Sequence, residues 1–131
     1  MDQYTIETIT NGLRAKATAV VEWRNNRDLY LELSLDNSTH STLDLDCFSA
    51  FKRLRGNCFR EVTFCCNGGR RNFVQSGMMQ QGGGFYGYLV TLGERSSQDE
   101  TGFIFDYCTP ELVVSVEEQD AFRDEWFRSL S

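Results

Sequence analysis

The residues of this sequence most capable of chemistry are five cysteines and a single histidine, His40. Structural zinc sites use cysteine and histidine ligands in spaced pairs such as Cys-x-x-Cys. Here the closest cysteines, Cys65 and Cys66, are adjacent, and adjacent residues of a strand point to opposite faces. A cysteine nucleophile would need His40 beside it as a base, and nothing in the sequence brings the two together. We therefore expect reduced thiols that are buried as small apolar groups, and no metal site.

Glycine, arginine and carboxylate clusters do not complete a catalytic site either. The run Gly82-Gly83-Gly84 could suggest a phosphate-binding loop, but such loops lead into a helix N-terminus, and here a strand pattern follows. Arg70 and Arg71 could bind an anion, although two arginines in a polar loop are more often simply solvated. Carboxylates are abundant near the C-terminus, but without a neighbouring histidine or metal signature they do not predict acid–base catalysis. The sequence therefore predicts no enzymatic activity and no cofactor.

The acidic residues are concentrated in the last third of the chain. The formal net charge is −6. Residues 1–93 contain nine acids and ten bases, whereas residues 94–131 contain ten acids and three bases. A field of this sign repels phosphates and attracts a basic partner, so direct nucleic-acid binding is not expected. The alternative explanation is a solvated helix face that serves solubility.

The first 36 residues have the pattern of an antiparallel meander. Apolar side chains alternate with polar ones from Leu13 to Trp23 and from Leu29 to Leu35. Asn11-Gly12 is a strong hairpin-turn signal between the first two strands. A polar loop containing His40 is expected next, over residues 36–42.

Two helices are predicted farther along the chain. The first extends from about residue 44 to residue 55, because Phe48, Phe51 and Leu54 recur at helical spacing, and Gly56-Asn57 is expected to end it. The second starts at a capping box, in which Ser115 takes a free backbone amide and Glu118 reaches back to the start of the helix. It extends to about residue 130.

Residues 67–84 are rich in glycine, and their second part, residues 75–84, has neither a helical nor a strand period. Loops longer than about 12–15 residues in a compact domain are usually functional or disordered. This stretch carries two arginines and two methionines, so it is predicted to be an interaction loop that joins two paired strands. The expected strands of the whole chain are 5–10, 13–23, 29–35, 58–66, 85–92 and 103–107.

These elements predict one α+β domain over residues 1–131, in the order β-β-β-α-β-β-β-α. Two helices pack on an antiparallel sheet of about five to six strands. No stretch approaches the ~20 apolar residues of a membrane span. The N-terminus lacks the basic start and apolar run of a signal peptide, so we expect a cytoplasmic protein without a membrane partner.

Several short motifs in the second half of the chain resemble one family of small bacterial proteins. The family is found with polymorphic toxins, and its members look like immunity proteins of the contact-dependent growth-inhibition type. The resemblance covers residues 60–131. The motifs that carry it are 66–72 (CNGGRRN), 76–78 (SGM), 82–84 (GGG), 105–107 (FDY), 114–119 (VSVEEQ) and 126–130 (WFRSL).

This resemblance implies a cytosolic inhibitor that binds a cognate toxin domain, often a nuclease, and it implies no catalytic residue. The partner is expected to be basic, because many nucleases must approach phosphates. The alternative is a small-ligand or peptide-binding module, with a pocket formed by the glycine-rich residues 67–84 and by Phe103, Phe105 and Tyr107. The residues expected to bind the partner are Asp99, Glu100, Asp106, Glu117, Asp120, Asp124, Arg70, Arg71, Met78 and Met79.

Overall fold

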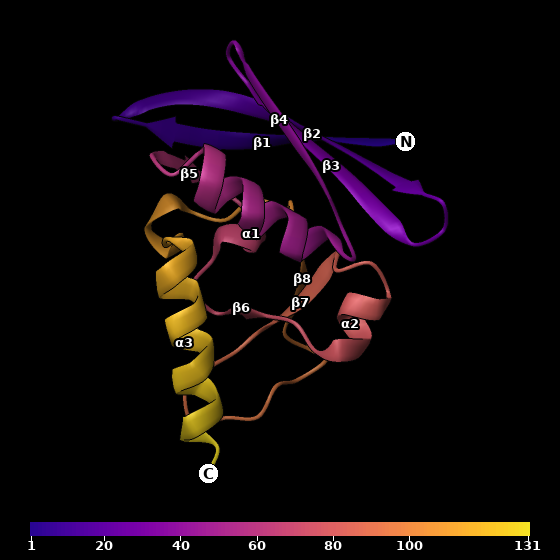
Figure 1. Ribbon diagram of the computed structural model, residues 1–131. Helices are drawn as coiled ribbons and strands as arrows, with labels where there is room; N and C mark the ends of the chain where they lie inside the picture. The colour runs from indigo at the N-terminus through magenta and orange to yellow at the C-terminus, as the bar shows by residue number, and fades with distance from the viewer.

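The alternating N-terminal pattern builds the larger of two antiparallel sheets. Its strands are β1 (Asp2–Thr10), β2 (Leu13–Arg24), β3 (Asp28–Leu35), β4 (Ser38–Asp44) and β5 (Val62–Phe64), in the spatial order β4-β3-β2-β1-β5. Figure 1 shows this curled sheet in a computed structural model that describes residues 1–131. The expected meander is thus confirmed and is extended by two edge strands.

The polar stretch 36–42 is a strand rather than a loop, which corrects the sequence prediction. Only Asp36 and Asn37 form a turn, with Asp36 at a φ of 54°, a left-handed conformation that asparagine and aspartate tolerate. Every residue of β4 then pairs with β3, from Leu35↔Ser38 to Leu29↔Asp44. The strand escaped prediction because it lies at a solvent-exposed edge and has no alternating apolar face.

Helix α1 (Cys47–Cys58) packs beneath the large sheet (Figure 1). Asp46 caps it by accepting hydrogen bonds from the backbone amide and the hydroxyl of Ser49, at 2.9 and 2.8 Å. The predicted stop at Gly56-Asn57 is wrong, because the helix continues through both residues to Cys58. The buried face of α1 and the inner face of the sheet enclose the main core, a cluster of 19 buried apolar residues that includes Phe51 and Leu31.

A second, smaller sheet lies below α1. Its strands are β6 (Phe73–Val74), β7 (Tyr86–Leu89) and β8 (Thr101–Phe103), in the order β6-β7-β8. The predicted pairing of 58–66 with 85–92 is wrong, because β5 pairs with β1 and β7 lies between β6 and β8. The predicted strand 103–107 also ends early, since Ile104 and Phe105 leave the sheet to be buried in the main core.

Helix α3 (Val116–Ser129) extends along one side of the molecule, away from the large sheet (Figure 1). Its cap lies at the predicted place: the Ser115 hydroxyl accepts from the Glu118 amide at 3.1 Å and donates to the Glu118 carboxylate at 3.2 Å. Phe122 and Trp126 form a second buried cluster with Val74 and Val90. The α+β class predicted from the sequence is therefore confirmed, with the strands divided between two sheets.

Three short helical segments complete the chain. They are a 3-10 turn at Asn67–Gly69, helix α2 (Gly77–Gln81) and a 3-10 turn at Pro110–Leu112. None of the helices has the length and apolar character that crossing a membrane requires.

Candidate interaction surfaces

The start of the glycine-rich stretch is held by two buried polar side chains. Arg55 of α1 donates to the carbonyl oxygens of Gly68, at 3.1 Å, and of Val114. Gln119 of α3 donates to the carbonyls of Gly68 and Arg70, both at 2.9 Å, and its own side-chain oxygen accepts from Arg55 at 3.1 Å. Burial lowers the pKa of the Arg55 guanidinium, which has no carboxylate within ion-pair distance. This stretch therefore joins α1 to α3 and contains three short elements, rather than one structureless loop.

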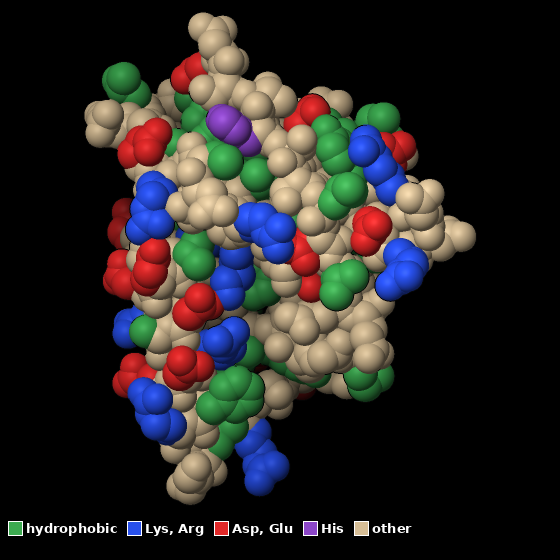
Figure 2. Space-filling model, in the orientation of Figure 1, with side chains coloured by type: hydrophobic (Ala, Val, Ile, Leu, Met, Phe, Trp, Pro, Cys, Tyr) green, Lys and Arg blue, Asp and Glu red, His purple; other side chains and the backbone are tan.

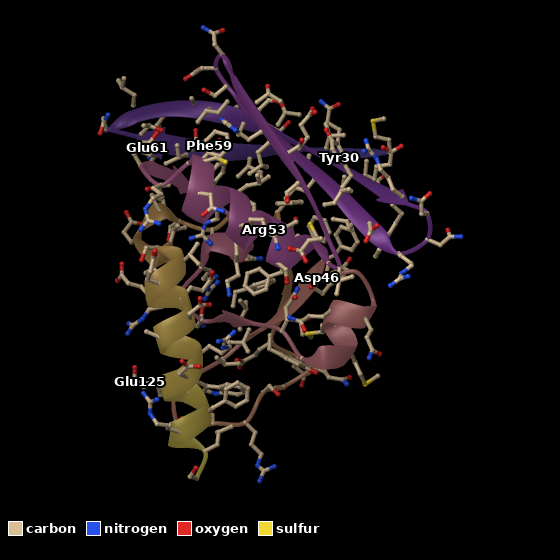
Figure 3. All side chains as sticks on the ribbon, viewed as in Figure 1. Tyr30, Asp46, Arg53, Phe59, Glu61 and Glu125 are labelled. Atoms are coloured by element: carbon tan, nitrogen blue, oxygen red, sulfur yellow. The ribbon has the colours of Figure 1, made fainter.

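The glycines of this stretch permit close packing instead of binding phosphate. A Cβ on Gly68 would lie 2.6 Å from Cγ1 of Ile104 and 2.9 Å from Cδ2 of Phe51. Gly84 has a φ of +73° and lies against Asp46, the capping residue of α1. The Gly83 carbonyl accepts from the Cys47 amide at 2.7 Å. The glycine triplet thus packs against the start of α1 (Figure 3, where Asp46 is labelled).

The two methionines predicted to bind a partner lie on α2, at one side of the molecule (Figure 1). Met78 is 83% exposed, whereas Met79 is half-buried. The side chain of Gln75, before α2, donates to the carbonyls of Gly84 and Tyr86, after α2, at 2.7 and 2.9 Å. These bonds hold the two ends of the segment that carries α2 together. Met78 is therefore presented on a short, anchored helix.

Arg70 and Arg71 line a groove between the second sheet and α3. The cavity has a volume of about 670 Å³, and its apolar lining includes Val90 and Phe122. The Nε of Arg70 donates to Asn72 at 2.8 Å, and the Arg71 guanidinium lies 4.9 Å from the centre of the Phe122 ring. Neither arginine forms an ion pair.

The acids of α3 that were expected to bind a partner are instead paired with bases of this chain. Asp120 pairs with Lys52 of α1, Glu117 with Arg60 at 2.8 Å, and Asp124 with Arg123 at 3.5 Å. The hydrogen bond from Arg60 lowers the pKa of Glu117. Figure 2 shows basic and acidic side chains interleaved along α3. Glu125, labelled in Figure 3, points away from the body without a partner. The face of α3 is thus less acidic than the sequence suggests.

A surface that the sequence predicted only in part, through Phe103, Phe105 and Tyr107, lies where the two sheets meet. The ring of Phe103 in β8 contacts two tyrosine rings. Its centre lies 5.2 Å from that of Tyr4 in β1 and 5.4 Å from that of Tyr86 in β7. It also stacks on Phe85 at 6.4 Å. We call this surface, together with two flanking rings, the aromatic patch. Its members are Tyr4, Trp23, Phe85, Tyr86, Phe103 and Tyr107.

The two flanking rings extend the aromatic patch in opposite directions. A Cβ at Gly83 would lie 2.6 Å from Phe85 Cε2 and 3.1 Å from Trp23 Cζ2, so both rings lie against this glycine. At the other end, Tyr107 lines a shallow cavity of about 460 Å³ with Phe105, whose ring centre is 6.1 Å from that of Phe103. Trp23, Tyr86 and Tyr107 are 47%, 57% and 55% exposed. Tyr4, Trp23 and Tyr86 were missed because a half-buried strand also explains each of them.

One of the predicted partner-binding acids, Asp106, lies next to the aromatic patch, and two others lie at the far end of β8. Asp106 follows Phe105, is exposed, and forms no ion pair. Asp99 and Glu100 are exposed just before β8, where the Glu100 carbonyl accepts from the Leu89 amide at 2.8 Å. The structure therefore divides the predicted residues among five places. These are the patch margin (Asp106), the loop before β8 (Asp99, Glu100), α3 (Glu117, Asp120, Asp124), the groove (Arg70, Arg71) and α2 (Met78, Met79).

The cysteines and the histidine are placed for packing. Burial raises the pKa of Cys66 to about 12 and that of Cys108 to about 11, which keeps both thiols protonated near neutral pH. His40 lies on the exposed edge strand β4, with its ring edge-on to Phe59 at 5.3 Å; it is the purple side chain of Figure 2. No group of three or more His, Cys, Asp or Glu side chains is arranged to hold a metal ion.

A scan against models of protein families finds none that matches the chain, and a search of curated proteins likewise finds no match.

Proposed function

We propose that this protein acts by binding another protein through the aromatic patch, as a cytoplasmic immunity protein that neutralises a cognate bacterial toxin domain. The observation that carries the proposal is the exposure of three large aromatic side chains, Trp23, Tyr86 and Tyr107, around the ring cluster of Phe85, Phe103 and Phe105. Tyrosine and tryptophan are enriched at interfaces and supply most of the binding energy where they occur. They also combine an apolar body with a hydrogen-bonding end.

Exposed acids beside the patch, at Asp106, and ahead of β8, at Asp99 and Glu100, favour a basic partner. Asp99, Glu100 and Asp106 are exposed and form no ion pair. Unpaired acids beside an apolar surface speed the association of a basic protein. Nuclease toxins are commonly basic, because they bind phosphates. The resemblance of residues 60–131 to immunity proteins supports the same kind of partner.

The test uses the toxin domain encoded beside this gene. The purified protein is titrated with that domain by calorimetry, and protection is measured as growth of cells that express the toxin. The double variant Trp23→Ala/Tyr86→Ala is expected to bind at least tenfold more weakly, since truncating such residues typically costs 1–2 kcal/mol or more each. The matched control is Phe127→Ala, because Phe127 is 55% exposed but lies on α3, outside the patch.

Two results would contradict the proposal. If the wild-type protein neither binds the toxin domain nor protects cells, the immunity function is wrong. If it binds and the double variant does so equally well, the interface lies elsewhere, and Met78 or the α3 acids become the next surfaces to test.

The groove lined by Arg70 and Arg71 supports a second candidate function, the binding of a small ligand. Its volume of about 670 Å³ lies within the range of small-molecule sites, and its guanidinium groups are free of carboxylate partners. Glu111 and Glu118 also line the groove, so a ligand with an apolar body and both an anionic and a cationic group, such as an amino acid, fits that combination. A panel of such metabolites, screened by thermal shift with Arg70→Gln/Arg71→Gln as control, tests it: a specific rise in Tm that the double variant loses supports the site.

A further inference from the structure

One edge of the large sheet is left open for half the length of β1. Strand β5 pairs only with Thr8–Thr10 of β1. We call the position beside β1, on the side of β5, the lane; the last backbone hydrogen bond in it joins the Cys65 amide to the Glu7 carbonyl at 2.8 Å. The chain then turns sharply, with the Cys66 amide bonded to the Phe64 carbonyl. Cys66 pairs instead with Tyr107. The lane beside Asp2–Ile6 therefore holds no strand.

The backbone groups of Gln3 and Thr5 point into this open lane. Thr10 and Leu13 flank the two-residue turn between β1 and β2, so their backbones hydrogen-bond to each other. Every second residue before Thr10, namely Thr8, Ile6 and Tyr4, therefore also hydrogen-bonds to β2. The residues between them direct their amides and carbonyls to the other side, as Glu7 does toward Cys65. By the same alternation, Gln3 and Thr5 carry free donors and acceptors.

The open lane has walls of different character on its two sides. The cavity of about 460 Å³ along Thr5–Glu7 is lined by Phe105 and Tyr107, and the Tyr4 ring lies 5.3 Å from that of Phe105. The same cavity is also lined by Glu7 and Lys16, which lie directly across from each other on the outward face of the sheet. An incoming strand would thus have aromatic rings on one face and a mixed pair of charges on the other.

The other edge of the sheet lacks such a wall. β4 is also open, because its residues pair only with β3. Its exposed residues are Ser38, Thr39, His40, Ser41 and one apolar residue, Leu43, which is 48% exposed. Backbone groups are free at both edges, but the β1 edge adds a cavity with two aromatic rings, Phe105 and Tyr107, in its lining.

We propose that the open edge of β1, from Gln3 to Ile6, binds an extended segment of a partner protein as an added antiparallel strand in line with β5. Main-chain hydrogen bonds to Gln3 and Thr5 give the affinity, and alternate side chains give the specificity. The segment carries apolar residues at the positions that face Tyr4, Phe103 and Phe105, and polar residues at the positions between them. That the donor is the toxin domain rests on the proposed function; the strand site itself does not.

The test needs no toxin. Linear random peptides displayed on phage are selected against the full-length protein, and the binders are titrated against two edge variants. Thr5→Pro removes an outward amide from the β1 edge without touching the β1–β2 ladder. Ser41→Pro is the matched control, because the same alternation turns the Ser41 amide outward from β4. We expect selected peptides with alternating apolar residues, at least about tenfold weaker binding by Thr5→Pro, and unchanged binding by Ser41→Pro.

A second measurement on the wild-type protein covers the case in which Thr5→Pro fails to fold. A bound peptide should slow amide hydrogen exchange at Gln3 and Thr5, whereas the amides of Tyr4 and Ile6 are already protected by β2. The strand site is overturned if no peptide is selected, or if bound peptides leave the exchange at Gln3 and Thr5 unchanged. A peptide that binds in this way while the toxin domain does not bind supports the strand site and overturns only the proposed function.

Discussion

The region around the large sheet and the region around α3 are stabilised in different ways. Under the sheet, 19 buried apolar residues pack together, with Phe51 in edge-to-face contact with both Phe64 and Phe105. Against α3 the apolar cluster has only four members, and Arg55 and Gln119 tie the helix to the carbonyls of the glycine-rich stretch. The first region is specified by apolar periodicity, and the second largely by hydrogen bonds between residues far apart in sequence.

The largest effect should come from deleting a ring at the centre of the main core. Phe51→Ala is expected to lower the free energy of unfolding by about 3–5 kcal/mol, because it removes a fully buried ring and leaves a cavity. Phe122→Ala deletes the same side chain from the small cluster, where the ring is 8% exposed, and should cost less. Urea denaturation measures both changes.

Hydrogen exchange separates the two variants further. Phe122→Ala should increase exchange chiefly in α3, whereas Phe51→Ala should do so in both regions, because local and global unfolding differ in free energy. Equal losses with the same exchange pattern would mean that the two regions form one cooperative unit, and the contrast between them would be lost.

A substitution of the buried Arg55 tests whether hydrogen bonds stabilise the region around α3. Arg55→Met keeps an unbranched side chain but removes the donors to Gly68, Val114 and Gln119. A buried acceptor left without a donor costs about 1–3 kcal/mol, so a loss of that size in unfolding free energy is expected. Arg53→Met is the control, because Arg53 is an exposed arginine of the same helix, paired with Asp44 at 3.0 Å. A stability of Arg55→Met equal to that of the control would show that the buried network contributes nothing net.

The same contrast explains which parts of the fold could be predicted from the sequence. Alternation from Leu13 to Leu35 predicted two strands because each buries one face against the core. Strand β4 has no such alternation, because its residues lie at the sheet edge, and it was missed. Gly56 did not end α1, and the helix closes only at Phe59, whose amide caps it by bonding to the carbonyl of Leu54.

The candidate sites were predicted less well, for a related reason. The acids of α3 are visible in sequence, but their pairing with Lys52 and Arg60 depends on where α1 lies. The aromatic patch combines residues from β1, β2, β7 and β8, and no single window contains it. Asp106 was predicted because exposure and charge are local properties, whereas the arginine–glutamine network that orders residues 67–70 is not local.

A pH-dependent loss of stability should come from thiols buried where the two regions meet. Burial raises the pKa of Cys66 to about 12 and of Cys108 to about 11, whereas thiols of an unfolded chain ionise near ~8.5. Below the unfolded value both states are protonated, and the full stability is present. As the pH rises above it, only the unfolded state loses protons, so the free energy of unfolding falls by about 1.4 kcal/mol per pH unit for each thiol.

Urea midpoints measured from pH 7 to pH 10 check this expectation. Cys66→Ala is expected to have a shallower decline at the alkaline end than the wild type. A decline of equal slope in the two proteins would assign the alkaline loss to other groups.

The smallest effect on stability is expected from the exposed ion pair between Arg60 and Glu117, which, like the buried Arg55, connects α1 to α3. Arg60 follows α1 and reaches α3 from outside, donating to the Glu117 carboxylate at 2.8 Å. Both side chains are more than half exposed, so solvent screens the pair, and Arg60→Gln should leave the urea midpoint unchanged within error. The hydrogen bond from Arg60 is nevertheless the main cause of the lowered pKa of Glu117, so the variant should raise that pKa toward its ordinary value. An NMR titration of the Glu117 carboxyl measures this directly. If Arg60→Gln instead destabilises the protein as much as Arg55→Met does, then α3 is attached as strongly by surface charge as by the buried network, and the distinction between the two regions fails at their shared helix.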